Sequence, residues 1–227
     1  MQLGELRRGS ASKPGPRRLV PGPLRWLAAA LLVACVALTA VLAVRFAGYG
    51  LPGWLDSAFD PRIQAGMSRF PRLLDWLPDV GTRGPVAVMT LALALACAVT
   101  RRWAGAALAI VAVPVATGLT EYALKPTIGE AIGQAFPSGH ATTMFALAAT
   151  CAVLLADPPG RRVSGGIRLM LAFAALLLAA AVAAAMVAIA AHTFTDAVAG
   201  AAVGTAVVLA GALVLDLLAS RARRFMP

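Results

Sequence analysis

The sequence of 227 residues is poor in charge, in histidine and in cysteine. Only 13% of its residues are charged, about half the share of a typical soluble domain, whereas 60% are hydrophobic. The three cysteines, Cys35, Cys97 and Cys151, lie inside apolar runs, and no CxxC or Cys/His cluster accompanies them. The sequence therefore favours neither a disulfide framework nor a zinc-finger site, and it is not that of an ordinary soluble domain.

Long apolar runs take the place of the missing charge. A helix needs about 20 apolar residues to cross a bilayer, and six runs are close to that length: residues 26–47, 84–100, 103–124, 139–156, 168–190 and 194–219. We therefore predict an all-α fold, a polytopic membrane helix bundle with six transmembrane helices in one domain. Gly200 and Gly204 form a G-x-x-x-G pattern in the last run, which we interpret as a packing face within the bundle.

Three segments flank or interrupt these runs. Residues 1–25 combine Pro, Gly and Ser with six basic residues, and we predict that they form a disordered cytoplasmic tail. Residues 26–220 form the predicted membrane domain, and residues 221–227 form a second basic cytoplasmic tail. Residues 51–83 mix large apolar side chains with four Asp and four Arg. This mixture fits an amphipathic stretch in the membrane interface, with an ordinary structured loop as the alternative.

Lysine and arginine are distributed unevenly between the two sides of the predicted bundle. The connections on the side of the termini carry 14 of them, and those on the other side carry five. Because positive charge accumulates on the cytoplasmic side, we predict a multi-pass protein of the plasma (cytoplasmic) membrane with both termini cytoplasmic and residues 51–83 external. This distribution accounts for the net charge of +10 without a nucleic-acid partner, and membrane lipids are the expected surroundings.

Polar residues gather at the ends of three predicted spans, all on the external side. Lys125 follows the third span, the sequence PSGH at 137–140 opens the fourth, and His192 and Asp196 open the sixth. His192 and Asp196 are four residues apart and therefore share one face of a helix. A carboxylate beside an imidazole fixes its tautomer, and a histidine can act as a covalent nucleophile.

Together these groups indicate phosphoryl transfer. His140 can act as a general acid, the helix N-terminus after Pro137 attracts phosphate, and Lys125 adds a cation. Each residue taken singly has a plainer interpretation, as a structural histidine or as a lysine that reaches to the membrane surface. A metal site is a further alternative, although no zinc spacing matches. Its ligands would be His140, His192, Asp196 and either Glu121 or Glu130.

On these residues the sequence resembles the type-2 phosphatidic acid phosphatase superfamily, whose motifs are K-x6-R-P, P-S-G-H and S-R-x5-H-x3-D. The stretch FPSGHA contains the second motif in full, Lys125 matches the start of the first, and His192 and Asp196 match the end of the third. The resemblance covers about residues 26–219. It implies the six-span fold and a metal-independent hydrolase without a cofactor.

The resemblance also implies roles for the matched residues. His192 would accept the phosphate, Asp196 would orient His192, and His140 would be the general acid. The implied phosphate-binding residues are Lys125, Ser138 and Gly139. The implied substrate is a lipid phosphate or pyrophosphate of the polyprenyl or phosphatidic acid type, hydrolysed at the external membrane face through a phosphohistidine intermediate.

Both phosphate-binding arginines of the family motifs are missing. The Arg-Pro of the first motif falls on Ile132-Gly133, and Glu130 stands where some relatives have an arginine. The Ser-Arg of the third motif falls on Ala185-Met186. Arginine holds phosphate with a bidentate fork that apolar side chains cannot replace. Loss of one such donor to a transition state costs about 3–4 kcal/mol.

Three explanations of this loss stay open at the level of sequence. The protein can recruit another cation, such as Arg83 or an arginine of residues 51–83, or it can act on a substrate with a different charge. It can also be a non-catalytic family member that binds a lipid headgroup. A transporter is disfavoured because the polar residues lie at span ends and no internal repeat is visible. The sequence indicates neither the lipid nor the oligomeric state.

Overall fold

The structure, a computed structural model, describes residues 18–49, 53–128, 136–156 and 164–222. These residues form a helical bundle, as predicted. After a 3-10 turn, η1 (Gly22–Leu24), its long helices are α1 (Arg25–Tyr49), α4 (Arg83–Val99), α5 (Trp103–Gly118), α7 (Gly139–Ala156), α8 (Gly165–Ala188) and α9 (Phe194–Ala222). Two shorter helices, α2 (Trp54–Met67) and α3 (Pro71–Val80), connect α1 to α4.

The helices confirm the predicted membrane-spanning class. Among the described residues, five helices are long and apolar enough to cross a membrane. The remaining predicted span, residues 84–100, corresponds to α4, which has 17 residues and follows α3 at a bend of 64°. The helices α3 and α4 pass the same test only together. The chain is therefore a multi-pass integral membrane protein with five or six spans.

The third predicted span ends in an irregular helical turn. α5 continues into a π-helical turn, η2 (Leu119–Leu124), and then into α6 (Lys125–Ile128). The Lys125 N–H donates to the Thr120 carbonyl five residues earlier, which is the π-helical spacing. Pro126 lacks an N–H, and in an α-helix its ring would clash with the carbonyl four residues earlier, which favours a wider turn.

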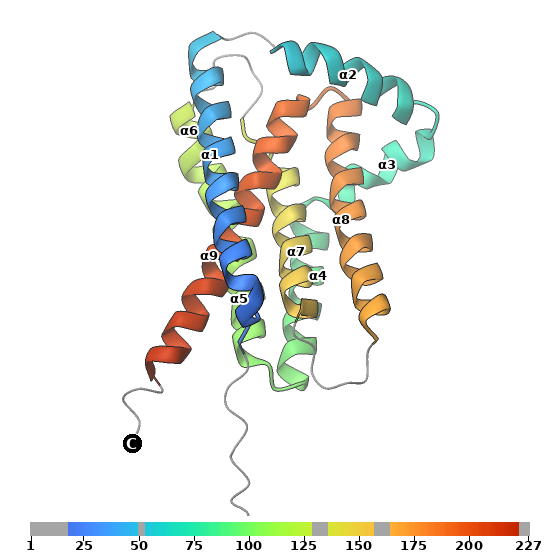
Figure 1. Ribbon diagram of the computed structural model, residues 1–227. Helices are drawn as coiled ribbons and strands as arrows, with labels where there is room; N and C mark the ends of the chain where they lie inside the picture. The colour runs from blue at the N-terminus through green and yellow to red at the C-terminus, as the bar shows by residue number, and fades with distance from the viewer. Residues whose placement is uncertain (1–17, 50–52, 129–135, 157–163, 223–227) are drawn as a thin grey trace, which may run out of the picture.

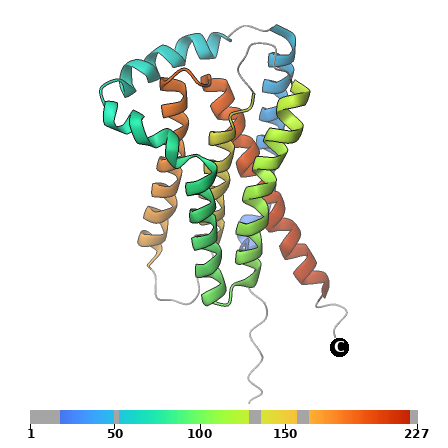
Figure 2. The same cartoon turned by 180° about the vertical axis from the view of Figure 1, so that it is seen from behind.

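Helix α7 occupies the centre of the bundle. It packs against α9, α8 and α5, while α1 lies along α9 and α4 lies along α5, as Figure 1 and Figure 2 show from opposite sides. Gly200 and Gly204 let α9 approach α7, because a Cβ atom at these positions would collide with the backbone oxygens of Ser138 and Thr142, respectively. The G-x-x-x-G pattern is therefore a packing face within the bundle, as predicted.

The two ends of the bundle carry different elements. In Figure 1, α1 begins and α9 ends at the lower end. The helices α2 and α3 lie across the upper end, together with the start of α7 and the turn between α8 and α9. The aromatic side chains of Trp54, Phe70 and Trp76 are exposed on this segment, which suits a membrane interface. Most of the described part of the segment is helical, in α2 and α3, and its position in the membrane interface stays a prediction.

The N-terminal segment differs from the prediction of a disordered tail over residues 1–25. Residues 1–17 lie outside the described residues, but Leu19 and Val20 are buried. Their N–H groups donate to the two carboxylate oxygens of Asp216 at 2.7 and 3.0 Å. The chain before α1 is therefore attached to the last turns of α9 by a buried carboxylate, a long-range contact that the tail's composition does not reveal.

Candidate active site

The turn between α8 and α9 presents His192 at the upper end of the bundle. α8 ends in a Schellman motif, in which the N–H groups of Ala190 and Ala191 donate to the carbonyls of Val187 and Met186, both at 3.0 Å. Ala190 takes the left-handed conformation that this motif requires, with φ of 56°. His192 follows two residues later, so its position is set by the end of a packed helix.

His192 lies beside Asp196, which is in the first turn of α9. The Nδ1 atom of His192 is 3.5 Å from Oδ2 of Asp196. The imidazole is 11% exposed and the carboxylate is 1% exposed. The carboxylate is held by the Thr193 N–H, which donates to Oδ2 at 3.0 Å. The structure thus brings together the pair that the spacing predicts.

Two buried polar atoms of this pair make no hydrogen bond to the residues that the structure describes. They are Nδ1 of His192 and Oδ1 of Asp196. A buried polar atom without a hydrogen bond lowers the stability of the fold by about 1–3 kcal/mol. Two such atoms in neighbouring side chains therefore suggest a functional role for the pair. A small rotation of the imidazole would let an Nδ1–H donate to the carboxylate, which would leave Nε2 as the free ring nitrogen.

The PSGH stretch is joined directly to the start of α9. The Ser138 N–H donates to the Asp196 carbonyl at 3.1 Å. Ser138 is fully buried, and its hydroxyl accepts the Ala141 N–H at 3.4 Å, as an N-cap residue does. This connection places the start of α7 beside the His192–Asp196 pair.

His140 stands half-buried in the first turn of α7. Its imidazole lies against Gly81 in the turn between α3 and α4, where a Cβ atom would come within 2.7 Å of the ring. His140 interacts electrostatically with His192, Lys125 and Glu121. The side chain is therefore close enough to the other predicted residues to share their electrostatic environment.

Lys125 reaches the same end of α7, but its charge is already paired. Its Nζ atom is 2.7 Å from Oε1 of Glu121. A Cβ atom on Gly139 would collide with the Glu121 carboxylate and would lie 3.5 Å from the lysine Nζ. Because Gly139 has no side chain, the Lys125–Glu121 ion pair can lie against the start of α7, next to Ser138 and His140.

The comparisons with known proteins identify the family of the chain. Residues 86–218 match the PAP2 superfamily, which is more than half of the chain. The chain belongs to the PAP2 superfamily. Searches of curated proteins and of solved structures found no match. In this PAP2 protein the matched residues include all six predicted site residues, whereas α1, α2 and α3 precede them.

The positions of the missing family arginines are only partly described in this PAP2 protein. Ala185 and Met186 are buried in α8, and the Met186 carbonyl accepts the His192 N–H at 3.3 Å. The third-motif position therefore adjoins the site through its main chain. The first-motif counterparts lie outside the described residues: Glu130, Ile132 and Gly133.

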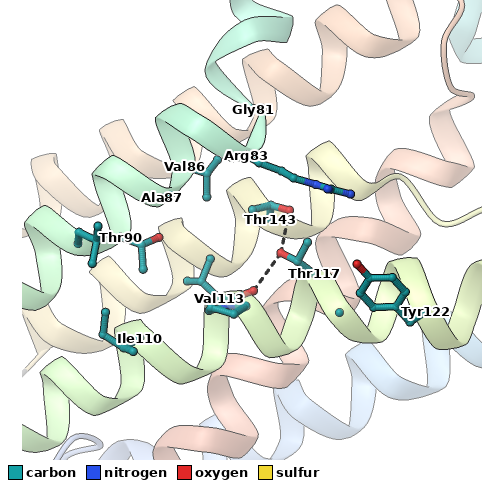
Figure 3. Close-up of a pocket in the computed structure, with 13 residues that line it drawn as sticks. Gly81, Arg83, Val86, Ala87, Thr90, Ile110, Val113, Thr117, Tyr122 and Thr143 are labelled. Atoms are coloured by element: carbon teal, nitrogen blue, oxygen red, sulfur yellow. Dashed lines mark hydrogen bonds between the residues drawn. The ribbon is translucent and has the colours of Figure 1, made fainter.

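An apolar groove of about 430 Å³ lies between α4 and α5. Arg83 lines it, and Figure 3 shows the Arg83 side chain extending over Thr143 of α7. The Thr143 hydroxyl donates to the Gly139 carbonyl one helical turn away, at 2.7 Å. Arg83 is therefore an exposed cation on the same groove as Thr143, which lies one helical turn after the PSGH stretch.

The alternative metal site does not assemble in the described part of the chain. No group of three or more His, Cys, Asp or Glu side chains there is arranged to hold a metal ion. Glu121 instead bonds to Lys125, and Glu130 lies outside the described residues.

Two acidic residues near the site are absent from the sequence-based prediction. Asp56 accepts hydrogen bonds from Thr195, and Asp60 accepts one from Phe194. In the sequence, these two aspartates are simply two of the four in residues 51–83, a segment that mixes charged and apolar residues. Their partners lie more than a hundred positions away, so no local pattern identifies the contacts.

Proposed function

We propose that this PAP2 protein is a membrane-embedded, metal-independent phosphatase for a lipid phosphate or pyrophosphate of the polyprenyl or phosphatidic acid type. The observation that carries the proposal is the His192 imidazole 3.5 Å from a buried Asp196 carboxylate. A buried carboxylate beside a partly exposed imidazole is suited to orient a histidine and to stabilise its charged form. We place the reaction at the external membrane face because of the distribution of Lys and Arg.

In the proposed reaction, Nε2 of His192 attacks the phosphorus while Nδ1 faces Asp196. The bond between phosphorus and the leaving oxygen breaks, and His140 gives its proton to that oxygen. Water then attacks the phosphohistidine, His140 takes up a proton from the water, and inorganic phosphate leaves. His192 and His140 return to their starting states, so the two steps balance.

The start of α7 supports binding of the phosphate. A helix N-terminus attracts anions through its N–H groups and its dipole, and the glycine at position 139 lets the Lys125 and Glu121 side chains come close to this helix start. Lys125 lies beside Gly139, and the Ser138 hydroxyl, which accepts from Ala141, still has a proton to donate. Lys125, Ser138 and Gly139 are therefore the proposed phosphate-binding residues.

Arg83 is the proposed substitute for the missing arginines. It is exposed and lines the apolar groove together with Thr143. An apolar groove beside a cation suits a substrate with a lipid chain and an anionic headgroup. This supports a lipid phosphate rather than a small soluble phosphate ester.

A non-catalytic lipid-binding protein is the second candidate. The observation that favours it is the ion pair between Lys125 and Glu121, because a paired lysine attracts phosphate less strongly and both motif arginines are missing. Such a protein would bind an anionic headgroup without forming a phosphohistidine.

The test is phosphate release by the purified protein in detergent, measured across phosphatidic acid and polyprenyl mono- and diphosphates. We expect release from at least one of them, loss of release in His192→Ala, and labelled phosphate trapped on His192 after rapid quenching. Binding of a lipid phosphate without release or trapping would favour the headgroup-binding protein.

A further inference from the structure

The start of α9 is held by acidic side chains from a distant part of the chain. Oδ1 of Asp56 accepts the Thr195 N–H at 2.8 Å, and Oδ2 accepts the Thr195 hydroxyl at 3.0 Å. Oδ1 of Asp60 accepts the Phe194 N–H at 2.8 Å. Both aspartates belong to α2, so two residues on one helix fix the first two residues of another.

These contacts add to a cap that α9 already has. The Thr193 N–H donates to the Asp196 carboxylate, and the Asp196 N–H is 3.3 Å from the Thr193 hydroxyl, which is the reciprocal pattern of a capping box. This local pair already starts the helix. The carboxylates of α2 therefore fix where the start of α9 lies, rather than whether the helix forms.

Asp56 is the strongest sign of this role. It is 1% exposed, and a buried carboxylate is tolerated only when hydrogen bonds replace its hydration. Thr195 supplies two of these bonds, and the Gly53 N–H supplies a third at 3.0 Å. The charge also faces the positive end of the α9 dipole, which favours it there.

α2 also contacts the chain on both sides of His192 in the sequence, at Phe194 and at Val187. The Phe59 ring stacks on Phe194 with a centroid distance of 4.6 Å. The Gln64 side chain donates to the Val187 carbonyl, near the end of α8, at 3.5 Å. α2 therefore joins the element before His192 to the element after it.

We propose that α2 is a positioning clamp for the catalytic pair, in which Asp56 and Asp60 hold the start of α9 so that Asp196 faces the His192 imidazole. The catalytic consequence rests on the proposed phosphatase function. Asp56 and Asp60 are positioning residues, because they act through Thr195 and Phe194 rather than on the substrate. α2 precedes the residues matched to the PAP2 superfamily, so the clamp acts from outside the matched region.

The clamp also determines the side from which a phosphate approaches. The first N–H groups of α9 are occupied by the carboxylates of Asp56, Asp60 and Asp196. These charges repel an anion at that helix end, and they leave the start of α7, next to Gly139, as the N-terminus that faces the phosphate.

The test uses the full-length protein in detergent micelles and two readouts. The first is kcat and KM for phosphate release from the lipid phosphate that the native protein hydrolyses best. The second is the 15N NMR spectrum of protein labelled at histidine, which contains only two imidazoles because the chain has two histidines. His140→Gln assigns the two sets of signals.

Asp56→Ala and Asp60→Ala remove the clamping carboxylates, and Asp60→Asn keeps an acceptor oxygen for the Phe194 N–H. The matched control is Asp75→Ala, an exposed aspartate of the neighbouring helix α3. We expect kcat to fall about 10- to 100-fold in the two clamp variants, with KM changed by no more than about twofold. The His192 signals should move in both, while Asp60→Asn and Asp75→Ala should resemble the native protein.

A folded Asp56→Ala variant with native kcat and native His192 signals would overturn the clamp. If Asp56→Ala does not fold, Asp60→Ala and the isosteric Thr195→Val, which removes one donor to Asp56, are judged by the same two readouts. If the native protein releases phosphate from no lipid phosphate, but the His192 signals move in the clamp variants and not in Asp75→Ala, the phosphatase proposal fails and the clamp stands.

Discussion

At the residue scale, the charges next to Gly139 govern how strongly this protein attracts a phosphate. Lys125 is the proposed phosphate-binding cation, yet the Glu121 carboxylate is 2.7 Å from its Nζ atom. The carboxylate also lies against Gly139, where it would repel the oxygens of a bound phosphate. With both motif arginines missing, this single acidic residue has a large influence on the net charge of the site.

Glu121→Gln should therefore improve binding of a lipid phosphate. The change removes one negative charge and keeps a similar shape, so we expect KM to fall about tenfold, equivalent to about 1.4 kcal/mol. The measurement is the kinetics of phosphate release, with Asp79→Asn on the exposed surface of α3 as the charge-matched control. A higher KM in Glu121→Gln would instead mean that Glu121 holds Lys125 in its working position.

Restoring the third-motif arginine should also increase activity. We expect Met186→Arg to raise kcat/KM tenfold or more, since one charge-assisted contact contributes about 1.5–3 kcal/mol, and Glu130→Arg to add to the gain. Met186 is 7% exposed, and a charge near the end of a span is costly unless it faces a polar cavity. Expression and thermal stability must therefore be measured beside phosphate release.

The control for this restoration is His192→Ala in the Met186→Arg background. Activity that survives the control would show that His192 is not the nucleophile. If the native protein is fast and Met186→Arg slows it, another cation already occupies the arginine's place, and Arg83 is the first residue to replace.

At the element scale, the ends of the helices determine the geometry of the site more than their interiors do. Ala190 has a positive φ of 56° at the end of α8, a conformation that costs an L-residue about 1–2 kcal/mol relative to the right-handed one. Glycine adopts it without that strain. The Schellman motif that positions His192 is therefore slightly strained in the native chain.

Ala190→Gly should stabilise the protein by about 1 kcal/mol, the strain relieved less the greater entropy of glycine in the unfolded chain. Because the backbone conformation is retained, phosphate release should stay within about twofold of the native rate. Thermal unfolding in detergent measures the first expectation, and a lower melting temperature in Ala190→Gly would contradict it.

The α2 helix should give the protein a measurable pH dependence. Burial raises the pKa of Asp60 above its ordinary value of 3.8, the Phe194 N–H opposes the rise, and the charges of Asp56 and Asp196 add to it. A raised pKa means that the folded state holds the proton more tightly, so stability is lost as the pH rises from the unfolded pKa through the folded one. We expect this loss of stability to be smaller in Asp60→Asn. The melting temperature of Asp60→Asn minus that of the native protein should therefore increase as the pH rises from about 4 to 7. Parallel melting curves over this range would refute the assignment.

At the scale of the whole molecule, the bundle gathers all proposed site residues at one end. The first turn of α7, the turn before α9 and the helices α2 and α3 lie together there, whereas α1 begins and α9 ends at the other end. Because Lys and Arg are sparse on the side of α2, we predict that this end faces outward, which would place the proposed hydrolysis at the external membrane face.

Cysteine labelling tests this orientation. In a variant whose three native cysteines are replaced, Ser57→Cys on the exposed face of α2 should react with an impermeant thiol reagent added to intact cells. Arg221→Cys, at the exposed end of α9, should react only after lysis. The reverse pattern would place the site on the cytoplasmic side.

The sequence by itself determined the helical membrane class and the residues that meet around α7. Apolar length is a local property, and a bilayer requires each apolar run to form a helix that satisfies its own backbone. The polar residues at the span ends follow from the same property, because an even number of crossings returns them to one side. The gathering of His140, His192, Asp196 and Lys125 at one end of the bundle was predictable for that reason, together with Ser138 and Gly139 of the PSGH stretch. Their catalytic and phosphate-binding roles stay predictions.

Only the tertiary structure decided how this end of the bundle is held. Asp56 is 139 positions from Thr195, and Asp216 is 197 positions from Leu19. Gly81, in the turn between α3 and α4, lies against the His140 ring. A single aspartate or glycine in a connecting segment has the same local sequence signature whether it is exposed or buried. Its role depends on which backbone groups the packed helices bring to it, and that packing is a property of the whole bundle.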